Sequence, residues 1–372
     1  MIRLKELATE AARNVISGTS KPISALVALM LVVGAIGMAQ ARMMVALAQD
    51  AEQWRAQGSA QVIIPAPNAI RGDQCEALAR IAGISAAGAV RAAPSIRLAV
   101  LPSTQIPQFE VTPGMANLLN LQPQEFQVTG GVWLAGDLAD VVGWQVMSLA
   151  YLPESIPATA VQTRSDFTVS GVYPRPDDGR STQLAYSILS PVPAAGLFDA
   201  CWVEIWPESG AVTEWLLLPV DLVAAGGSQA QIPQIGRVNS SAGLEFGAAA
   251  QLAVLPIWPL TFAAVSFSAV LGFLIIHSRR LELASALHAG IDKTSLVIQT
   301  QLEALAVTVP TLAVVFVTSY GMALAQNPDP PLVAFYPAAR TAYLALIAFH
   351  FGLLLTTLMV RERHLFRHFK QR

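Results

Sequence analysis

The stretch FGAAAQLAVLPIWPLTFAAVSFSAVLGFLII, residues Phe246–Ile276, contains no Asp, Glu, Lys or Arg. A helix of about 20 apolar residues crosses the hydrocarbon core of a bilayer, so this stretch is long enough with residues to spare. Pro256 and Pro259 lie near its beginning and predict a bend or the start of a helix there. The stretch therefore predicts a membrane-spanning helix.

A charged segment, RRLELASALHAGIDKT from Arg279 to Thr294, follows this stretch and leads to another apolar run. The pattern predicts that the helix continues out of the membrane and ends at Gly290, because glycine adopts the left-handed backbone of a helix C-terminus without a steric penalty. We expect a short second helix next, and then a return into the membrane. An elbow of this kind favours docking to a soluble partner over catalysis.

The composition is that of a membrane protein with a sizeable domain outside the bilayer. The mean hydropathy is +0.50, and only 13% of the 372 residues are charged. Roughly 200 residues of ordinary polarity separate the first apolar segment from the second, which is enough for a domain with its own core. Four segments pass the length test for a membrane helix: Pro22–Ala41, Leu252–Ile276, Ala304–Ala325 and Thr341–Val360.

The basic residues predict the orientation of these spans, because Lys and Arg are enriched on the cytoplasmic side. Residues 42–245 carry ten arginines, no lysine and eighteen acids, a formal charge of −8, and are expected outside. Residues 2–18 predict an amphipathic helix on the inner leaflet, with a disordered tail as the alternative. Twelve basic residues flank the spans on the predicted inner side: Arg3, Lys5, Arg13, Lys21, Arg279, Arg280, Lys293, Arg361, Arg363, Arg367, Lys370 and Arg372.

The outer segment mixes short strand and helix patterns, which predicts an α+β domain. Cys201–Trp206 alternates like a further strand and puts Trp202 and Trp206 on one face, where core packing is favoured over a ligand platform. The expected strands are Gln61–Pro65, Ala89–Arg91, Ser95–Leu101, Val132–Leu134, Gln145–Leu152 and Phe167–Val172, and the expected helices are Asp73–Ala82, Gly114–Leu121 and Gly136–Val142.

The two cysteines, Cys75 and Cys201, both lie in this outer segment. In an oxidising compartment they favour one disulfide that closes a very long loop, and two buried thiols are the alternative. No Cys/His spacing resembles a zinc site.

Within the spans, Ala264, Ser268 and Gly272 form a stripe of small residues four apart, which lets another helix approach closely. Pro310 in the third span predicts a kink. His350 lies in the fourth span, and no predicted span contains an acidic residue that could be its partner. We therefore expect a polar helix contact rather than a proton relay.

The catalytic motifs that we sought are missing from the sequence. There is no GxxxxGK[ST], so this chain does not cradle ATP phosphates by that motif, and there is no HExxH or GxSxG. The outer segment has no histidine to serve as a general base. The net charge of −2 gives no nucleic-acid signature. The chain is therefore expected not to be an enzyme, with no metal and no cofactor of its own.

Three features of the sequence resemble one known family. They are the order of amphipathic helix, span, large outer domain and three further spans, the segment Arg279–Gly290 followed by Gln301–Ala304 (QLEA), and VWLAGDLA at Val132–Ala139 with Gly143 and FTVSGVY at Phe167–Tyr173. By these features the chain resembles a MacB/FtsX-type (type VII) ABC transporter permease, and the last of them resembles the MacB-like outer domain. Ala284 stands where the family usually has Gly, and His288 interrupts the usual Ala-Leu-Gly.

The resemblance implies a permease subunit in the bacterial cytoplasmic (inner) membrane, multi-pass, with both termini cytoplasmic and the large domain extracytoplasmic. Its partners would be a cytoplasmic ABC ATPase that binds ATP and Mg, a second permease as homo- or heterodimer, membrane lipid and an extracytoplasmic protein. ATP hydrolysis would move the outer domain and so export or extract a peptide, lipoprotein, lipid or hydrophobic drug. The residues expected to couple to the ATPase are Arg279, Arg280, Glu282, Gly290, Ile291, Asp292, Lys293 and Thr294.

Two other functions are compatible with this sequence. One is an FtsX-like regulator that transports nothing and activates an extracytoplasmic cell-wall hydrolase, and the other is a membrane-anchored sensor without an ATPase. The fold class in each case is an α-helical membrane protein with four transmembrane helices plus an α+β domain between the first and second. The predicted boundaries are 1–20 for the amphipathic helix, 21–57 for the first span and stalk, and 58–245 for the outer domain. They continue with 246–287 for the second span and stalk, 288–300 for the elbow, 301–326 and 335–362 for the last two spans, and 363–372 for the tail.

Overall fold

The computed structural model describes residues 4–121, 131–146, 149–151, 166–207, 210–226 and 233–361. The chain divides into two compact units, which are described separately below. Unit 1 comprises Met1–Glu52 and Gly247–Arg372, and unit 2 comprises Gln53–Phe246. Residues 362–372 lie outside the described part, and with them the predicted tail and its basic residues Arg363, Arg367, Lys370 and Arg372.

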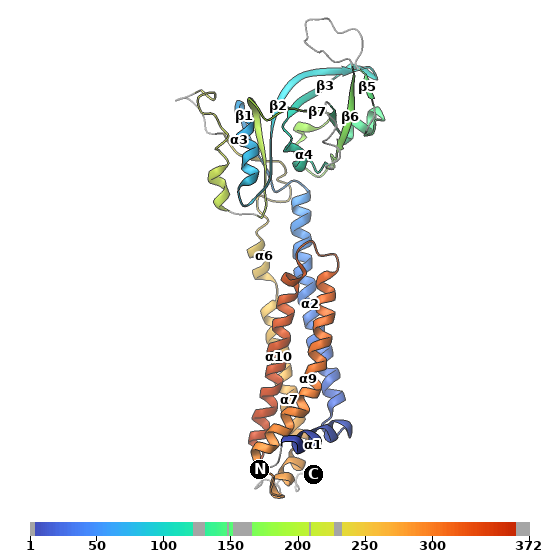
Figure 1. Ribbon diagram of the computed structural model, residues 1–372, viewed down its shortest axis with the longest axis vertical. Helices are drawn as coiled ribbons and strands as arrows, with labels where there is room; N and C mark the ends of the chain where they lie inside the picture. The colour runs from blue at the N-terminus through green and yellow to red at the C-terminus, as the bar shows by residue number, and fades with distance from the viewer. Residues whose placement is uncertain are drawn as a thin grey trace. The chain divides into compact units, whose positions relative to one another are not determined.

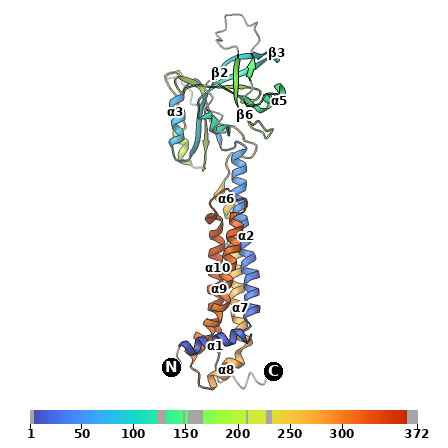
Figure 2. The same ribbon diagram turned by 45° about the vertical axis from the view of Figure 1, so that its right-hand side comes forward.

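Unit 1 is a bundle of long helices that lie side by side (Figures 1 and 2). Among the described residues, four helical segments are long and apolar enough to cross a membrane: Pro22–Ala56, Ala248–Ser278, Lys293–Leu324 and Pro331–Met359. The predicted number and order of these segments are confirmed. The helices of the unit are α1 (Leu4–Ile16), α2 (Pro22–Ala56), α6 (Ala248–Val254), α7 (Ile257–Ser278), α8 (Arg280–His288), α9 (Lys293–Leu324) and α10 (Pro331–Met359).

Two predictions about the helix boundaries are wrong. The second span does not continue as one helix into the elbow, because Arg279 takes φ −103° and ψ 10° between α7 and α8. The Arg279 N–H donates to Ile276 three residues back, which tightens the last turn of α7. No short helix separates the elbow from the third span either, since α9 begins at Lys293 and continues through Pro310 to Leu324.

Helix α1 packs on α9, and Figure 2 shows it lying across one end of the bundle. Leu7 and Ala11 on its apolar face are buried, while Ile16 is exposed. The amphipathic pattern predicted contact with the inner leaflet. Two residues of that apolar face are instead buried within unit 1, because the side of a neighbouring helix also shields apolar groups from water.

Helices α7 and α10 approach each other very closely. Ala264, Ser268 and Gly272 are fully or almost fully buried on α7. A Cβ added at Gly272 would overlap the carbonyl oxygen of Phe349, and one added at Gly352 would overlap that of Ala269. Both positions therefore need glycine, because the backbone of the facing helix occupies the space that a side chain would fill.

Buried polar groups also join the helices of the bundle. Gln40 on α2 donates to the Ile257 carbonyl (3.0 Å) and to Thr261 on α7 (3.1 Å), and Thr261 contacts Thr341 on α10 at 2.7 Å between their hydroxyl oxygens. His350 lies 2.7 Å from Gln301 Oε1 through Nδ1 and 3.2 Å from Thr308 Oγ1 through Nε2. His350 thus makes polar contacts between α9 and α10.

Unit 2 is built on a nine-stranded mixed sheet, counted over the described residues, in the order β5-β6-β4-β7-β3-β2-β8-β1-β9. Most neighbouring strands are antiparallel, but β3–β7 and β4–β6 are parallel. The strands are β1 (Gln61–Arg71), β2 (Ile84–Leu98), β3 (Leu101–Val111), β4 (Val132–Ala135), β5 (Leu149–Tyr151), β6 (Asp166–Tyr173), β7 (Ile188–Pro191), β8 (Leu197–Ile205) and β9 (Gly236–Arg237), with helices α3 (Gly72–Ala77), α4 (Met115–Leu118) and α5 (Gly136–Val142).

The α+β class of this domain is confirmed, but several strand predictions are not. The two short strands expected at Ala89–Arg91 and Ser95–Leu101 are one strand, β2, with register shifts. The predicted helix Asp73–Ala82 divides into α3 and a 3₁₀ turn at Leu78–Arg80. Strand β5 is shorter than Gln145–Leu152, and residues 147, 148 and 152 of that prediction lie outside the described part.

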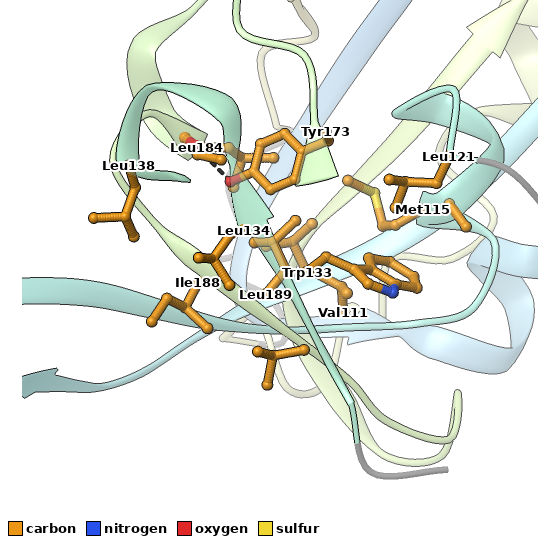
Figure 3. Packing of buried hydrophobic residues seen from close by; sticks show 14 of the residues in the cluster. Val111, Met115, Leu121, Trp133, Leu134, Leu138, Tyr173, Leu184, Ile188 and Leu189 are labelled. Carbon is orange, nitrogen blue, oxygen red and sulfur yellow. Dashed lines mark hydrogen bonds between the residues drawn. The ribbon is translucent and has the colours of Figure 1, made fainter. Parts of the chain in front are cut away.

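Two apolar cores stabilise unit 2. The larger surrounds Trp133 on β4, which is 1% exposed, and Figure 3 shows Tyr173, Met115 and Leu189 around it. The Tyr173 hydroxyl donates to the Leu184 carbonyl at 2.8 Å, so its polar end is satisfied inside the core, and burial raises the pKa of this phenol.

The second core contains the disulfide. Cys75 on α3 and Cys201 on β8 are both fully buried and joined, with their Cα atoms 5.9 Å apart and 126 positions apart in the sequence. Trp202 is buried in the first core, whereas Trp206 follows the end of β8. The bond therefore ties α3 to an interior strand of the sheet, the third from the β9 edge.

Candidate functional site

The elbow between α8 and α9 is a tight turn rather than a flexible loop. Helix α8 ends at His288, and Gly290 takes φ +93°, the left-handed conformation that glycine adopts most easily. The Gly290 N–H donates to Leu287 O (3.1 Å) and the Ile291 N–H to Ala286 O (3.1 Å). This is the Schellman pattern, so both bonds satisfy carbonyls at the end of α8.

Asp292 begins the next helix as its N-cap. Its side chain accepts a hydrogen bond from the Ser295 N–H (3.0 Å) and another from the Ser295 hydroxyl (2.6 Å). These hydrogen bonds hold the pKa of the exposed Asp292 carboxyl below its usual value. The elbow is thus closed by a C-terminal motif on one side and a capping side chain on the other.

Arg279, at the junction of α7 and α8, is the centre of an ionic cluster in which Arg279 and Glu303 are buried and Glu282 is exposed. Its guanidinium donates to both oxygens of Glu282 (Nε 3.0 Å, Nη2 2.8 Å), and through Nη1 to Glu303 on α9. The other oxygen of Glu303 accepts from the Asn14 amide of α1 at 2.6 Å. The side chains of Arg279 and Glu303 are only 4% and 5% exposed.

The electrostatics of this cluster keep Arg279 charged. Burial lowers the pKa of the guanidinium, but the hydrogen bonds and charges of Glu282 and Glu303 raise it by more, so the net pKa lies above its usual range. A bidentate guanidinium–carboxylate pair also fixes geometry. The cluster therefore joins α1, α7, α8 and α9 in a defined arrangement.

A small cavity of about 20 Å³, room for roughly one water molecule, adjoins the cluster. Arg279, Thr300 and Glu303 supply its polar wall. Ala25, Val307 and Phe349 from α2, α9 and α10 supply part of its apolar wall. A cavity of this size holds water rather than an organic ligand.

The structure brings the eight predicted coupling residues into one region but gives them different tasks. Arg279 and Glu282 belong to the ionic cluster, while Gly290, Ile291 and Asp292 form the turn. Arg280 lies 2.9 Å from the His277 ring nitrogen, and Lys293 donates to the Leu358 carbonyl near the end of α10. Thr294 is exposed.

Two members of the cluster were missed as site residues. Glu303 was named only as part of the Gln301–Ala304 motif, and Asn14 was assigned no role. A carboxylate directly before an apolar run is a usable signal, because such a group needs a cation when the helix is buried. Asn14 gave no comparable signal.

Unit 2 has a second noteworthy region, where the chain enters and leaves it. Trp54 contacts Trp206 and Phe246, with ring centroids 6.3 and 6.1 Å apart. Arg55 pairs with Glu204 at 2.6 Å, and Arg237 lies over the Trp54 ring at 5.7 Å. We call these six residues the entry clamp, because they fasten the last turn of α2 to β8, β9 and the exit segment.

Among the described residues, no group of three or more His, Cys, Asp or Glu side chains is placed to hold a metal ion.

Comparison with known proteins gives only distant structural similarity. No protein-family model matches the chain, and no curated protein matches it. A domain of a protein described as a permease from Porphyromonas gingivalis is 14% identical, with a TM-score of 0.33, over 45% of this chain and 88% of that one. The extracellular domain of the ABC-type transporter YknZ from Gram-positive bacteria is 10% identical, with a TM-score of 0.30, over 47% of this chain and 98% of that one. Similarity at this level establishes neither a common fold nor a common function.

Proposed function

We propose that this chain is the membrane subunit of an ABC-type transporter, in which a separate cytoplasmic ATPase supplies the energy. The observation that carries the proposal is the elbow, a closed turn whose two helices are joined at their bases by the buried Arg279–Glu303 pair and by the more exposed Glu282. A rigid projection between two membrane helices transmits a push from a soluble partner without absorbing it. ATP and Mg would bind to that partner.

The dimensions of unit 1 support its insertion in a bilayer. Helix α7 has 22 residues and ends beside the charged Arg279. At 1.5 Å per residue it is about 33 Å long, close to the ~30 Å of a hydrocarbon core. On α2, Lys21 and Arg42 bracket an apolar run of similar length. The basic residues orient the elbow toward the cytoplasm, as proposed above from the sequence.

The entry clamp supports transmission of motion to the extracytoplasmic domain. Helix α2 is continuous from Pro22 to Ala56, so it extends from the bundle into unit 2. Its last residues are fixed to the domain by Trp54 and by the Arg55–Glu204 ion pair. A displacement of the last turn of α2, which belongs to unit 2, would therefore be passed to the sheet of that unit.

In the complete machine we expect two membrane subunits and an export or extraction role. The substrate class proposed is a peptide, lipoprotein, lipid or hydrophobic drug on the outer side of the bacterial inner membrane. The chain itself would do no chemistry, and its contribution is movement.

The test is co-purification of the tagged full chain in mild detergent. Gly290→Pro and Lys293→Glu both disturb contacts inside the elbow, so Thr294→Arg is the sharper variant, because Thr294 is exposed and its replacement obstructs only the surface. Asp329→Arg, in the exposed turn between α9 and α10, is the matched control. We expect an ATPase subunit to accompany the wild type and the control and to be lost from Thr294→Arg.

An ATPase that remains bound to Thr294→Arg would exclude the elbow as the docking surface. If no nucleotide-binding protein accompanies even the wild type after crosslinking, the transporter proposal fails and a membrane-anchored sensor becomes the better interpretation.

A further inference from the structure

Arg340 on α10 is a cation whose charge no carboxylate among the described residues balances. Its guanidinium carbon lies 4.2 Å from the centre of the Trp258 ring on α7. In the part of the chain that the structure describes, Arg340 makes no hydrogen bond and no ion pair, and its Nε is buried without a partner. The side chain is half-buried, so it is neither fully hydrated nor neutralised.

The unpaired charge of Arg340 lies near the outer end of a proposed membrane helix. Trp258 is the second residue of α7, and Arg279 directly follows the other end of that helix. If α7 spans the bilayer, as the proposed function requires, Arg340 lies at the boundary between the outer headgroups and the hydrocarbon. Indole rings favour this boundary, and a long cationic side chain there directs its charge toward the headgroups.

An apolar surface extends from Arg340 along the same helix. Tyr336 is one turn away at i−4 and is 65% exposed, and the positions at i+4, i+7 and i+11 also present large exposed side chains. On α7, Phe262 follows Trp258 by one turn and is 73% exposed. The side chains at i+4, i+7 and i+11 are Leu344 (40% exposed), Ile347 (63%) and Phe351 (60%).

We propose that Arg340 and Trp258 form a binding site for a phospholipid of the outer leaflet. The lipid phosphate accepts hydrogen bonds from the Arg340 guanidinium, which stays stacked on the indole. The acyl chains lie along Phe262, Leu344 and Ile347. A guanidinium suits this task because it donates several hydrogen bonds to phosphate from one plane while its face remains on an aromatic ring.

Native mass spectrometry of the full chain, released from detergent, tests the site. The probes are phosphatidylglycerol and a phosphate-free diacyl glycolipid with the same chains. We expect wild type to retain more phosphatidylglycerol than glycolipid. In Arg340→Gln the ratio of the two bound lipids should fall about tenfold, the loss expected for one charge-assisted interaction. Arg340→Lys, which keeps the charge but not the planar fork, should fall between them.

Arg42→Gln is the matched control. Arg42 lies near the outer end of the apolar run of α2 and is exposed, and it already donates to Gln49 at 3.3 Å. Its replacement should leave the lipid preference unchanged. Equal loss in Arg42→Gln and Arg340→Gln would mean general charge attraction and would overturn the site, as would an unchanged preference in Arg340→Gln.

A third probe, inorganic phosphate, distinguishes binding of a whole phospholipid from binding of a free phosphate anion. Inorganic phosphate should not displace the bound lipid, because it lacks the acyl chains that lie along α10. Displacement at equal concentration would mean that Arg340 binds a free anion, which contradicts the proposal.

The proposal depends on membrane insertion, and alkaline carbonate extraction measures that separately. A chain extracted into the soluble fraction would refute the proposed function itself. A chain that stays in the membrane, and whose Arg340→Gln variant keeps its lipid preference, would refute only the lipid site.

Discussion

In unit 2 the fully buried side chains include Trp133, Trp202 and Tyr173, whereas α7 and α10 in unit 1 meet through Gly272 and Gly352. The difference is the one expected if unit 1 lies in a bilayer, as proposed above, and unit 2 lies in water. A domain in water gains stability by burying large apolar surfaces. Helices in lipid gain little from that, so they depend on close backbone packing and on polar contacts. The following predictions test whether each unit really depends on its own set of interactions.

The largest expected effect is loss of the disulfide in unit 2. Replacing Cys75 and Cys201 by Ala reopens a loop of 126 positions and should lower the free energy of unfolding of unit 2 by about 5 kcal/mol. Chemical denaturation of the full chain, followed by tryptophan fluorescence, measures it. Reduction of the wild type should shift the midpoint in the same direction, and equal midpoints with and without reductant would contradict the prediction.

Next comes the ionic cluster of unit 1. Arg279→Met leaves Glu303 buried without its cation and should destabilise the bundle by about 3–5 kcal/mol. Adding Glu303→Gln should recover much of this loss, since the buried charge is then removed. Thermal unfolding in detergent measures both, with Arg280→Met as the control at the neighbouring position. A double variant no more stable than Arg279→Met would argue against the ion pair as the cause.

Gly272→Ala should have a smaller effect on the same unit. The added methyl group would overlap the Phe349 carbonyl and force α7 away from α10, at a cost of about 1–3 kcal/mol. Gly321→Ala on α9 is the control, because nothing lies within 4 Å of its added Cβ. If both variants unfold at the same temperature in detergent, the close approach does not matter to stability.

The smallest expected effect concerns the cap of α9. Because the pKa of Asp292 is lowered in the folded protein, its contribution is present at neutral pH and is lost as the pH falls through that lowered value. Hydrogen exchange of the first amides of α9, corrected for intrinsic rates, should therefore accelerate in acid. Asp292→Asn keeps a capping side chain and should remove this pH dependence. The same acid response in both proteins would assign it to another group.

The sequence predicted unit 1 better than unit 2, for a physical reason. Apolar runs of about 20 residues predict long helices from composition alone, so the four long apolar helices were evident. Strand β3 was missed because LPSTQIPQFEV contains Pro102 and Pro107, which weaken a strand pattern. Strand β7 has only four residues and pairs in parallel with β3, a contact between distant segments that local pattern does not reveal.

In the candidate site too, features set by local sequence were predictable and features set by distant contacts were not. Gly290 as a helix end followed from local chemistry, and φ +93° agrees with that expectation. The break at Arg279 did not, because it accompanies a bond from Arg279 to Glu303, 24 positions later. The need for glycine at position 352 could not be predicted for the same reason, because it arises from the backbone of Ala269 on another helix.

The reciprocal contact of Gly272 and Gly352 restricts the movements available to the bundle. Each helix places a carbonyl where the other has no side chain, so sliding or rotation of α7 against α10 would drive a neighbouring side chain into backbone. These two helices should therefore behave as one rigid element with no internal degree of freedom. Any rearrangement that begins at the elbow and travels through α7 should therefore carry α10 with it.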